Sequence, residues 1–292
     1  RGARAVKPAA FDYIRAETRE EALAALAEAG DDAAVLAGGL SLVAMMNMRL
    51  ARPEVLIDIN GLPDMADIAV ADGWLRTGPL LRQAGALASA EIAEAVPLLA
   101  RALPNVGHYQ TRSRGTLAGS VAHADPSAEV PLCLATLTGF VELTSTQGTR
   151  LVPARDFAEA ALVTVREPDE MITALQWPVA GAGQGAAFME VNQRHGDFAI
   201  VAAAAWAELS GEDGAMVCRL GLGGVEDRPR VFDASGPVAP SQLKRFVTDV
   251  VADWVSQLSP MQDPRADAAY RSHLARHLGA QVLTAALLEA MA

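Results

Sequence analysis

The sequence predicts an α+β protein with two lobes in its N-terminal part and a separate α+β domain after them. Residues 33–60 alternate strand-like and helix-like segments, as a βαβ unit does. From residue 61 the pattern changes to short strands and turns. Beyond a glycine-rich linker at residues 181–185, strands come first and helices last. We therefore expect a first lobe, a second lobe and a C-terminal domain over residues 1–60, 61–178 and 186–292.

The composition is that of an ordinary globular protein. Of the 292 residues, 51% are hydrophobic and 20% are charged, which excludes a disordered chain. The net charge of -11 argues against nucleic acid or an anionic membrane as a partner. The longest uninterrupted apolar run, residues 199–207, is far too short for a transmembrane segment. Residues 1–8 lack the apolar core of a signal peptide, so a cytoplasmic protein is expected.

The cysteine content limits the cofactors that this chain can hold by itself. Cys133 and Cys218 are too few for a disulfide framework or for a four-cysteine iron–sulfur or zinc site. Both lie among apolar residues, which favours buried structural thiols. No metal site is expected in this chain.

Clear boundary signals mark the elements of the first lobe. Thr18 and Glu21 form a capping box before alanines and leucines at helical spacing, and Gly30 follows as a C-terminal cap. A strand, a helix and a second strand are then expected over residues 33–37, 42–48 and 55–59.

The second lobe and the C-terminal domain have weaker signals. A hairpin is expected around Asp72 and Gly73, between strands at residues 68–70 and 74–77. Further helices are expected over residues 82–89, 97–103, 127–137, 241–257 and 270–291. Further strands are expected over residues 140–144, 150–152, 170–177, 188–192, 198–209 and 216–222.

The chain is organised around the turn formed by Ala37, Gly38, Gly39, Leu40 and Ser41. A strand that stops at two glycines and continues as a helix offers bare backbone N–H groups, which suit an anion such as a phosphate. The turn matches neither the Walker A nor the Rossmann pattern, because it lacks the lysine of the first and the third glycine of the second. A plain structural turn is the alternative interpretation.

A second glycine-rich stretch covers residues 112–120, some 75 residues beyond the first. Thr116 and Ser120 can donate hydrogen bonds to phosphate or ribityl oxygens, and Gly119 keeps the backbone open. Two such turns could hold a dinucleotide pyrophosphate from two sides. The alternative is again a pair of structural turns.

Taken together, these motifs resemble the flavoprotein (medium) subunit of the molybdenum hydroxylases, the group that includes carbon monoxide dehydrogenase and xanthine dehydrogenase. The first turn is followed by matching segments at residues 48–53 and 56–60, and the second turn matches over residues 114–126. Further matching segments, in the family's order, are residues 7–13, 194–199, 221–230 and 270–274. The resemblance runs almost from end to end.

The resemblance implies an FAD-binding domain of the vanillyl-alcohol-oxidase/MurB-like (PCMH) type in two lobes, followed by the family's C-terminal flavoprotein domain. It implies that both glycine turns grip the FAD pyrophosphate, that Asp125 lies towards the ribityl chain or flavin, and that Leu162 lies against the ring. Arg194 and Asp197 would approach the isoalloxazine, with a surface salt bridge as the alternative. The cofactor-binding residues expected on this basis are Ala37, Gly38, Gly39, Leu40, Ser41, Thr116, Leu117, Gly119, Ser120, Asp125, Leu162, Arg194 and Asp197.

Ala118 departs from the family pattern, which has a glycine pair where this chain has Ala118 and Gly119. Its methyl group would crowd the cofactor if this backbone required a positive φ. No base or metal ligand lies near His123 or His195 in the sequence at a spacing typical of a catalytic or metal site. Each is therefore interpreted as a hydrogen-bonded polar residue rather than a catalyst. No catalytic residue is assigned.

The function implied by the resemblance is electron transfer. An FAD-carrying subunit of a heterotrimer, often a dimer of heterotrimers, would take electrons from [2Fe-2S] clusters on a small partner subunit. The molybdenum cofactor would be on a large partner subunit, and the flavin would pass electrons to an external acceptor. The alternatives are a stand-alone flavin oxidoreductase of the same fold and a non-catalytic scaffold subunit that has lost FAD. The substrate and the electron acceptor are not readable from this chain.

Overall fold

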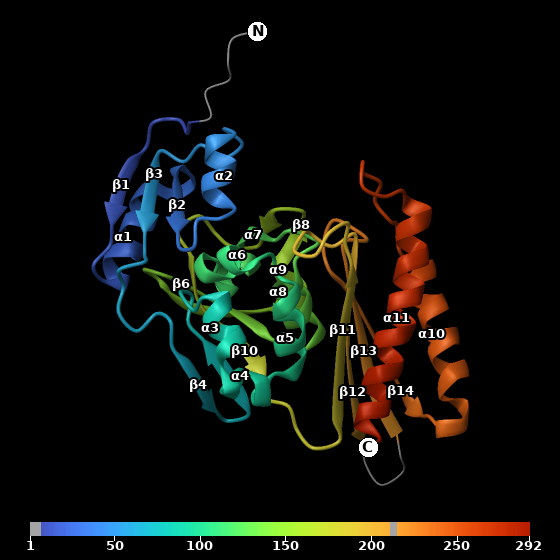
Figure 1. Cartoon of the computed structure of the whole chain (residues 1–292). Helices are drawn as coiled ribbons and strands as arrows, with labels where there is room; N and C mark the ends of the chain where they lie inside the picture. Colours follow the sequence, from blue (N-terminus) through green and yellow to red (C-terminus); the bar gives the residue numbers. More distant parts are fainter. Residues whose placement is uncertain (1–6, 211–214) are drawn as a thin grey trace.

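The computed structural model describes residues 7–210 and 215–292. Three sheets of three or more strands follow one another along the chain, and helices separate or cover them (Figure 1). The first sheet belongs to a small lobe, the second to a larger helical lobe, and the third to the C-terminal part. The prediction of a mixed α+β protein is confirmed.

The first lobe is a parallel three-stranded sheet in the order β1-β3-β2. Thr18 caps the first helix by accepting a 3.1 Å hydrogen bond from the Glu21 backbone, and Gly30 ends that helix at a φ of 54°, as the capping signals predicted. The strands β1, β2 and β3 span Asp12–Arg15, Ala33–Leu36 and Val55–Asp58, and the helices α1 and α2 span Arg19–Ala29 and Leu42–Asn47.

The second lobe is an antiparallel sheet in the order β4-β5-β10-β6-β7, with a helical layer inserted between β5 and β6. Its strands β4, β5, β6, β7 and β10 span Ile68–Ala71, Trp74–Thr77, Phe140–Ser145, Gly148–Pro153 and Met171–Pro178. The helices α3 to α8 span Gln83–Ala88, Ala90–Ala95, Pro97–Ala102, Tyr109–Arg114, Leu117–His123 and Glu129–Thr136. A short helix α9 and the small hairpin of β8 and β9 follow at Ala154–Phe157, Ala158–Ala160 and Val163–Thr164.

The helices α4, α6, α7 and α9 were not expected, and α6 and α7 come from the second glycine-rich stretch. The glycine-rich residues 112–120 were interpreted as one turn, but the structure divides them between α6, a bend at Gly115, and α7. Thr116 makes this possible, because its side chain accepts a 2.9 Å hydrogen bond from the Gly119 backbone and so caps α7.

The C-terminal part is an antiparallel sheet in sequential order, with two long helices on one face. Figure 1 shows α10 and α11 on the outer side of this sheet, away from the helical lobe. The strands β11 to β14 span Gln184–Val191, Val201–Ser210, Ala215–Gly223 and Arg230–Pro237, and the helices α10 and α11 span Leu243–Ser256 and Ala268–Ala290. Because β10 ends at Pro178 and β11 begins at Gln184, the connection between them covers residues 179–183, two residues earlier than the linker expected at 181–185.

Side chains along β12 alternate between two hydrophobic cores, one on each face of the C-terminal sheet. Ala202, Ala204 and Trp206 face the core of the second lobe, whereas Ala203 and Ala205 face the core under α10 and α11. This packing fixes the C-terminal sheet against α5 and α8, and α8 contributes Glu129 to the site described next.

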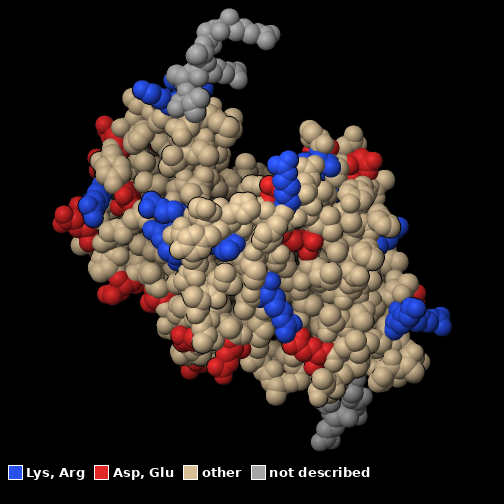
Figure 2. Space-filling view, viewed as in Figure 1, with Lys and Arg blue, Asp and Glu red and all other residues tan. Residues whose placement is uncertain are grey.

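The surface carries both signs of charge in small groups (Figure 2). The same view is hollowed between the first lobe and the C-terminal part. In the described part of the chain, no helix is both long enough and apolar enough to cross a membrane.

Candidate functional site

A cavity of about 500 Å³ lies where the two lobes and the C-terminal part meet. The first lobe contributes β2 and the start of α2, and the second lobe contributes the start of α7 and the loop before β10. The loop between β11 and β12 contributes Gly196, Asp197 and Phe198. A volume of this size and a mostly apolar lining are typical of a site for a small organic molecule or cofactor.

The two glycine turns, far apart in sequence, touch each other at the wall of this cavity. A Cβ added to Gly38 would lie 2.5 Å from the Arg114 carbonyl oxygen and 3.0 Å from the Gly115 Cα atom. Gly39 has a φ of 75°, a conformation that side chains with a Cβ rarely adopt. Ser41 stands at the N-terminal end of α2 without making a capping hydrogen bond, so its hydroxyl group is available to a ligand.

Asn60 and Arg82 hold the two turns together. The Asn60 side-chain amide donates a 2.8 Å hydrogen bond to the Ala37 carbonyl oxygen. Arg82 donates one hydrogen bond to Asn60 and another, of 2.5 Å, to the Arg114 carbonyl oxygen. Asp58 orients the amide of Asn60 through a 2.6 Å hydrogen bond. The relative position of the two turns is therefore set by the side chain of Asn60, just after β3, and that of Arg82, just before α3.

The residue Ala118 has an ordinary helical backbone in α7 and does not require a positive φ. Its side chain is buried in the core of the second lobe. The condition under which this methyl group was expected to crowd the cofactor, a positive φ, is therefore not met, and Ala118 is one of the residues that line the cavity. The reason is that residues 117–123 form a helix, in which alanine is the most favourable residue.

Asp125, between α7 and α8, and Leu162, between β8 and β9, also line the cavity. Asp125 accepts a 2.8 Å hydrogen bond from the Ser127 backbone and so shapes the turn before α8. Leu162 has a φ of 62°, unusual for leucine, and its backbone donates a 3.0 Å hydrogen bond to Ala124. Its side chain is half exposed although it lines the cavity.

Most of the residues expected at the site line this one cavity, and two do not. Leu117 is buried in the core of the second lobe, and Arg194 lies exposed in the loop between β11 and β12. Arg194 accepts a 2.9 Å backbone hydrogen bond from Asp197, which does reach the cavity. The lining residues among those expected are Ala37, Gly38, Gly39, Leu40, Ser41, Thr116, Gly119, Ser120, Asp125, Leu162 and Asp197.

The two histidines singled out in the sequence have different surroundings. His123 lines the cavity at the end of α7. His195 is exposed, and its ring lies edge-on to that of His108 at 6.3 Å. Within residues 7–210 and 215–292, no group of three or more His, Cys, Asp or Glu side chains is arranged to hold a metal ion.

Sequence reasoning missed several polar lining residues, namely Gln83, Glu129, Arg166 and Glu170. None belongs to a recognisable motif. A buried charged residue inside an otherwise apolar segment, such as Glu129 before Val130, was the one signal that could have identified any of them.

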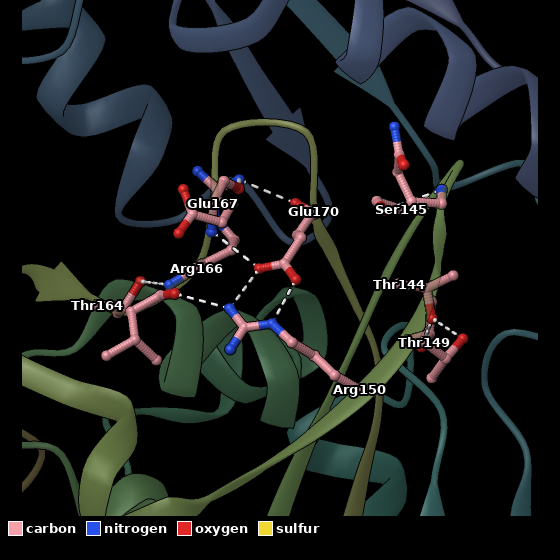
Figure 3. A network of polar contacts seen from close by, with 11 residues as sticks. Thr144, Ser145, Thr149, Arg150, Thr164, Arg166, Glu167 and Glu170 are labelled. Atoms are coloured by element: carbon pink, nitrogen blue, oxygen red, sulfur yellow. Dashed lines mark hydrogen bonds and ion pairs between the residues drawn. The ribbon is translucent and has the colours of Figure 1, made fainter.

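An ion-pair network holds the loop that carries Arg166 and Glu170 (Figure 3). Arg150 extends from β7 and makes two hydrogen bonds to Glu170, of 2.6 and 2.7 Å, and one of 2.9 Å to the Val165 carbonyl oxygen. The hydrogen bonds from Arg150 lower the pKa of Glu170. Arg166 donates to the carbonyl oxygens of Glu167 and Glu170, and burial lowers its pKa.

The residues of the cavity fit a flavin dinucleotide in two respects. Gly38, Gly39 and Gly119 line the cavity, so at these positions the backbone meets it without a side chain. The Gln83 side-chain oxygen, buried beside Gly115, has no hydrogen-bond partner within the described residues and can accept one from a ligand.

Comparison with known proteins agrees with this geometry. The family model described as "FAD binding domain in molybdopterin dehydrogenase" matches residues 9–180, and the one described as "CO dehydrogenase flavoprotein C-terminal domain" matches residues 186–286. Subunit alpha of the 6-hydroxypseudooxynicotine dehydrogenase complex of Paenarthrobacter nicotinovorans is 37% identical, over 97% of this chain and 96% of its own. The carbon monoxide dehydrogenase medium chain of Afipia carboxidovorans is 32% identical over 92% of this chain and 93% of its own.

Solved structures show the same fold. A chain of quinoline 2-oxidoreductase from Pseudomonas putida has a TM-score of 0.88 and 30% sequence identity. The match covers 98% of this chain and 100% of that chain. A chain of carbon monoxide dehydrogenase from Hydrogenophaga pseudoflava has a TM-score of 0.87 and 28% sequence identity. The match covers 97% of this chain and 99% of that chain. The chain therefore belongs to the FAD-binding medium subunits of the molybdenum hydroxylases, and it is an oxidoreductase component with an FAD-binding domain and a CO-dehydrogenase-type C-terminal domain.

Proposed function

We propose that this chain holds FAD in the shared cavity and passes electrons through it, from iron–sulfur clusters of a small partner subunit to an external acceptor. The observation that carries the proposal is that two glycine turns from different lobes line one cavity of about 500 Å³. In this proposal the molybdenum cofactor and the substrate belong to a large partner subunit, and the complex works in the cytoplasm.

The residues of the two turns would hold the pyrophosphate. Gly38 and Gly39 let the backbone approach the phosphates, and Ser41 adds a free hydroxyl group at the start of α2. On the facing turn, Thr116 already caps α7, so its remaining O–H and the hydroxyl group of Ser120 would donate to phosphate or ribityl oxygens.

Lining residues of the second lobe and of the C-terminal part, outside the two glycine turns, would hold the isoalloxazine ring. Leu162 would pack on it, Asp125 would lie towards the ribityl chain, and Asp197 would approach from the C-terminal part together with Phe198, whose side chain is 53% exposed. Bound FAD supplies the redox chemistry, and the protein supplies binding, orientation and electrostatics.

The first experiment is to purify the chain and record its visible absorption spectrum. The cofactor is then released with acid, identified and quantified against the protein. FAD in an equimolar amount would support the proposal. A protein that stays colourless with added FAD, both alone and after co-expression with large and small subunits of this family, would overturn it and favour the scaffold alternative.

The partner assignment needs a separate test. A tagged chain co-expressed with the two subunits should co-purify with both, and its FAD should be reduced when substrate is added to the assembled complex. If the chain binds FAD, does not bind either subunit and turns over a substrate by itself, it is instead a stand-alone flavin oxidoreductase.

A further inference from the structure

Arg271 is a completely buried cation of the C-terminal part. It lies in the first turn of α11, and its exposed fraction is 0%. It belongs to residues 270–274, one of the segments that match the family, but it is not among the residues that line the cavity. Taking a guanidinium out of water is costly unless hydrogen bonds and an opposite charge compensate it. Its partners therefore indicate what this side chain does.

One nitrogen of Arg271 joins the ends of two strands. Nη1 donates hydrogen bonds to two carbonyl oxygens, one of 2.5 Å to Ile200 and one of 2.6 Å to Gly224. Ile200 directly precedes β12 and Gly224 directly follows β13, so both lie just outside the ladder that pairs these strands. Nη2 forms an ion pair of 2.8 Å with Asp263, which compensates the buried charge.

The Ile200 end of this bridge is the base of the β11–β12 loop, residues 192–199. The Ile200 backbone donates a 2.7 Å hydrogen bond to the Val191 carbonyl oxygen, which closes the loop. The loop brings Asp197 and Phe198 to the cavity. The guanidinium therefore holds the point at which this loop rejoins the sheet.

The Gly224 end leads to a second segment of the cavity. The Gly224 backbone donates a 2.7 Å hydrogen bond to the carbonyl oxygen of Pro126, which directly follows the lining residue Asp125. Gly224 has a φ of 72°, and a Cβ there would lie 2.6 Å from the Ile200 carbonyl oxygen. Glycine thus allows the two bridged carbonyls to lie this close together. The bridge joins two segments that reach the cavity from different parts of the fold.

We propose that Arg271 is a positioning residue of the flavin site, because its bridge fixes the β11–β12 loop against the segment at residues 124–126. Through this loop it sets where Asp197 and Phe198 meet the flavin. The inference rests on the proposed FAD site. An apolar side chain would pack in this core at a lower desolvation cost, but it could not donate to the two carbonyls. A lysine would keep the charge, but it lacks the planar fork that serves both carbonyls and Asp263 at once.

The first measurement uses the full chain freed of FAD, so that it does not depend on flavin binding. Hydrogen–deuterium exchange, followed by mass spectrometry of overlapping peptides, compares the wild type with Arg271→Lys. The amides of Ile200 and Gly224 are held by their hydrogen bonds to Val191 and Pro126. Both should exchange about tenfold faster in the variant, because the bridge that holds these segments is lost. Unchanged exchange at both amides would refute the bridge.

Leu287→Ala is the matched control for a general loss of stability. Leu287 is also completely buried on α11, but it lies about 24 Å further along the helix than Arg271. It is near the start of β11, where a Cβ on Gly185 would collide with the Ala286 carbonyl oxygen, and α11 ends at the C-terminus (Figure 1). This variant should unfold at a lower urea concentration and leave exchange at the loop base unchanged. Equal acceleration in both variants would mean that the loop base follows overall stability, which contradicts the proposal.

Asp263→Asn keeps the proposal testable if Arg271→Lys does not fold. The Asp263 side chain is partly accessible, at 24%, and an asparagine can still accept from the backbones of Arg265 and Ala266. Loss of the negative charge weakens the hold on the guanidinium. The amides at the loop base should therefore exchange faster, by a smaller factor than in Arg271→Lys. Exchange as slow as in the wild type would count against the bridge.

A second measurement addresses the flavin. Fluorescence titration gives the Kd of FAD, and visible circular dichroism reports the surroundings of the bound ring. Arg271→Lys should bind FAD about tenfold more weakly and change the visible spectrum, whereas Leu287→Ala should match the wild type in both. A wild-type Kd and spectrum in Arg271→Lys would overturn the positioning role. If the wild type binds no FAD, the proposed function fails, while the exchange measurement still decides whether Arg271 holds the loop.

Discussion

Asn60 accepts a hydrogen bond of 2.5 Å from the Arg82 guanidinium, and each of these two side chains also holds one of the two glycine turns. Asn60 lies just after β3 in the first lobe, and Arg82 precedes α3 in the second. The pair is thus the direct polar link between the two sides of the cavity wall. It explains how turns so distant in sequence keep a fixed spacing.

Replacing Asn60 by alanine should weaken FAD binding by about 10-fold to 100-fold. The change leaves the Ala37 carbonyl and the Arg82 guanidinium without their partner, and a hydrogen bond to a charged group contributes about 1.5–3 kcal/mol. Fluorescence titration of the flavin-free protein measures the effect. Asn105→Ala is the matched control, since Asn105 binds only backbone carbonyls of α5 outside the cavity. Equal affinities for the two variants would show that the link does not position the turns.

Gly38→Ala should lower both FAD content and stability. The new methyl group would lie 2.5 Å from the Arg114 carbonyl oxygen, so the two turns would have to move apart. We expect a loss of about 1–3 kcal/mol of unfolding free energy, as for overpacking elsewhere. Gly85→Ala in α3 is the control, because its Cβ would meet Leu81 at an ordinary 3.7 Å and alanine favours a helix. Urea unfolding and the flavin-to-protein ratio report the two effects.

Arg150→Ala should destabilise the loop beside the cavity by about 1–3 kcal/mol at neutral pH, because the largely buried Glu170 carboxylate loses its two hydrogen bonds from Arg150 and keeps only the one from the Glu167 backbone. Arg150 lowers the folded-state pKa of Glu170, so the stabilisation is present above the unfolded value of about 4.5 and is lost as pH falls through the folded value. The wild type and the variant should therefore converge in acid.

The control for this ion pair is Arg245→Ala. Arg245 and Asp249 form an exposed pair, with side chains 89% and 67% accessible, and solvent screening limits it to less than about 1 kcal/mol. Chemical denaturation at several pH values compares the variants. A difference between wild type and Arg150→Ala that persists unchanged at pH 3 would contradict the proposed origin of the effect.

Glu129→Gln should change how stability depends on pH. Burial raises the pKa of Glu129 to about 7 from an ordinary 4.5, so the folded state binds more protons than the unfolded state between these values. Stability of the wild type is therefore fully present below about pH 4.5 and falls as pH rises through about 7. The variant lacks this loss, and it should gain on the wild type by up to about 3 kcal/mol between pH 4.5 and pH 8. A constant difference across this range would show that Glu129 is ionised throughout.

Leu162→Gly should separate stability from flavin affinity. A leucine in the left-handed region costs roughly 1–2 kcal/mol, which glycine relieves at some cost in chain entropy. Stability should stay level or rise by up to about 1 kcal/mol, whereas Leu162→Ala should not gain. Both variants lose the side chain at the cavity, so both should bind FAD about fivefold more weakly. Unchanged affinity in both would remove Leu162 from the flavin site.

The sequence by itself determined the elements whose signals are local. The Thr18 capping box, Gly30 at the end of α1, the βαβ order of the first lobe and the hairpin at Asp72 and Gly73 all appear where predicted. Such signals depend on near neighbours in the chain, and the glycine turns are of this kind. The cofactor class was implied by the family resemblance, in which the two glycine motifs are two of several matching segments in the family's order.

The tertiary structure alone decided which residues share the cavity. Sequence spacing could not show that Gly38 touches Arg114, that Asn60 bonds to Arg82, or that Arg194 stays outside while Asp197 enters. Nor could it show that Ala118 lies in a helix and so needs no positive φ. Helix α7 depends on the Thr116 cap and on packing of Leu117 into the core. These contacts join segments far apart in the chain, and their geometry comes from packing and register rather than from local propensity.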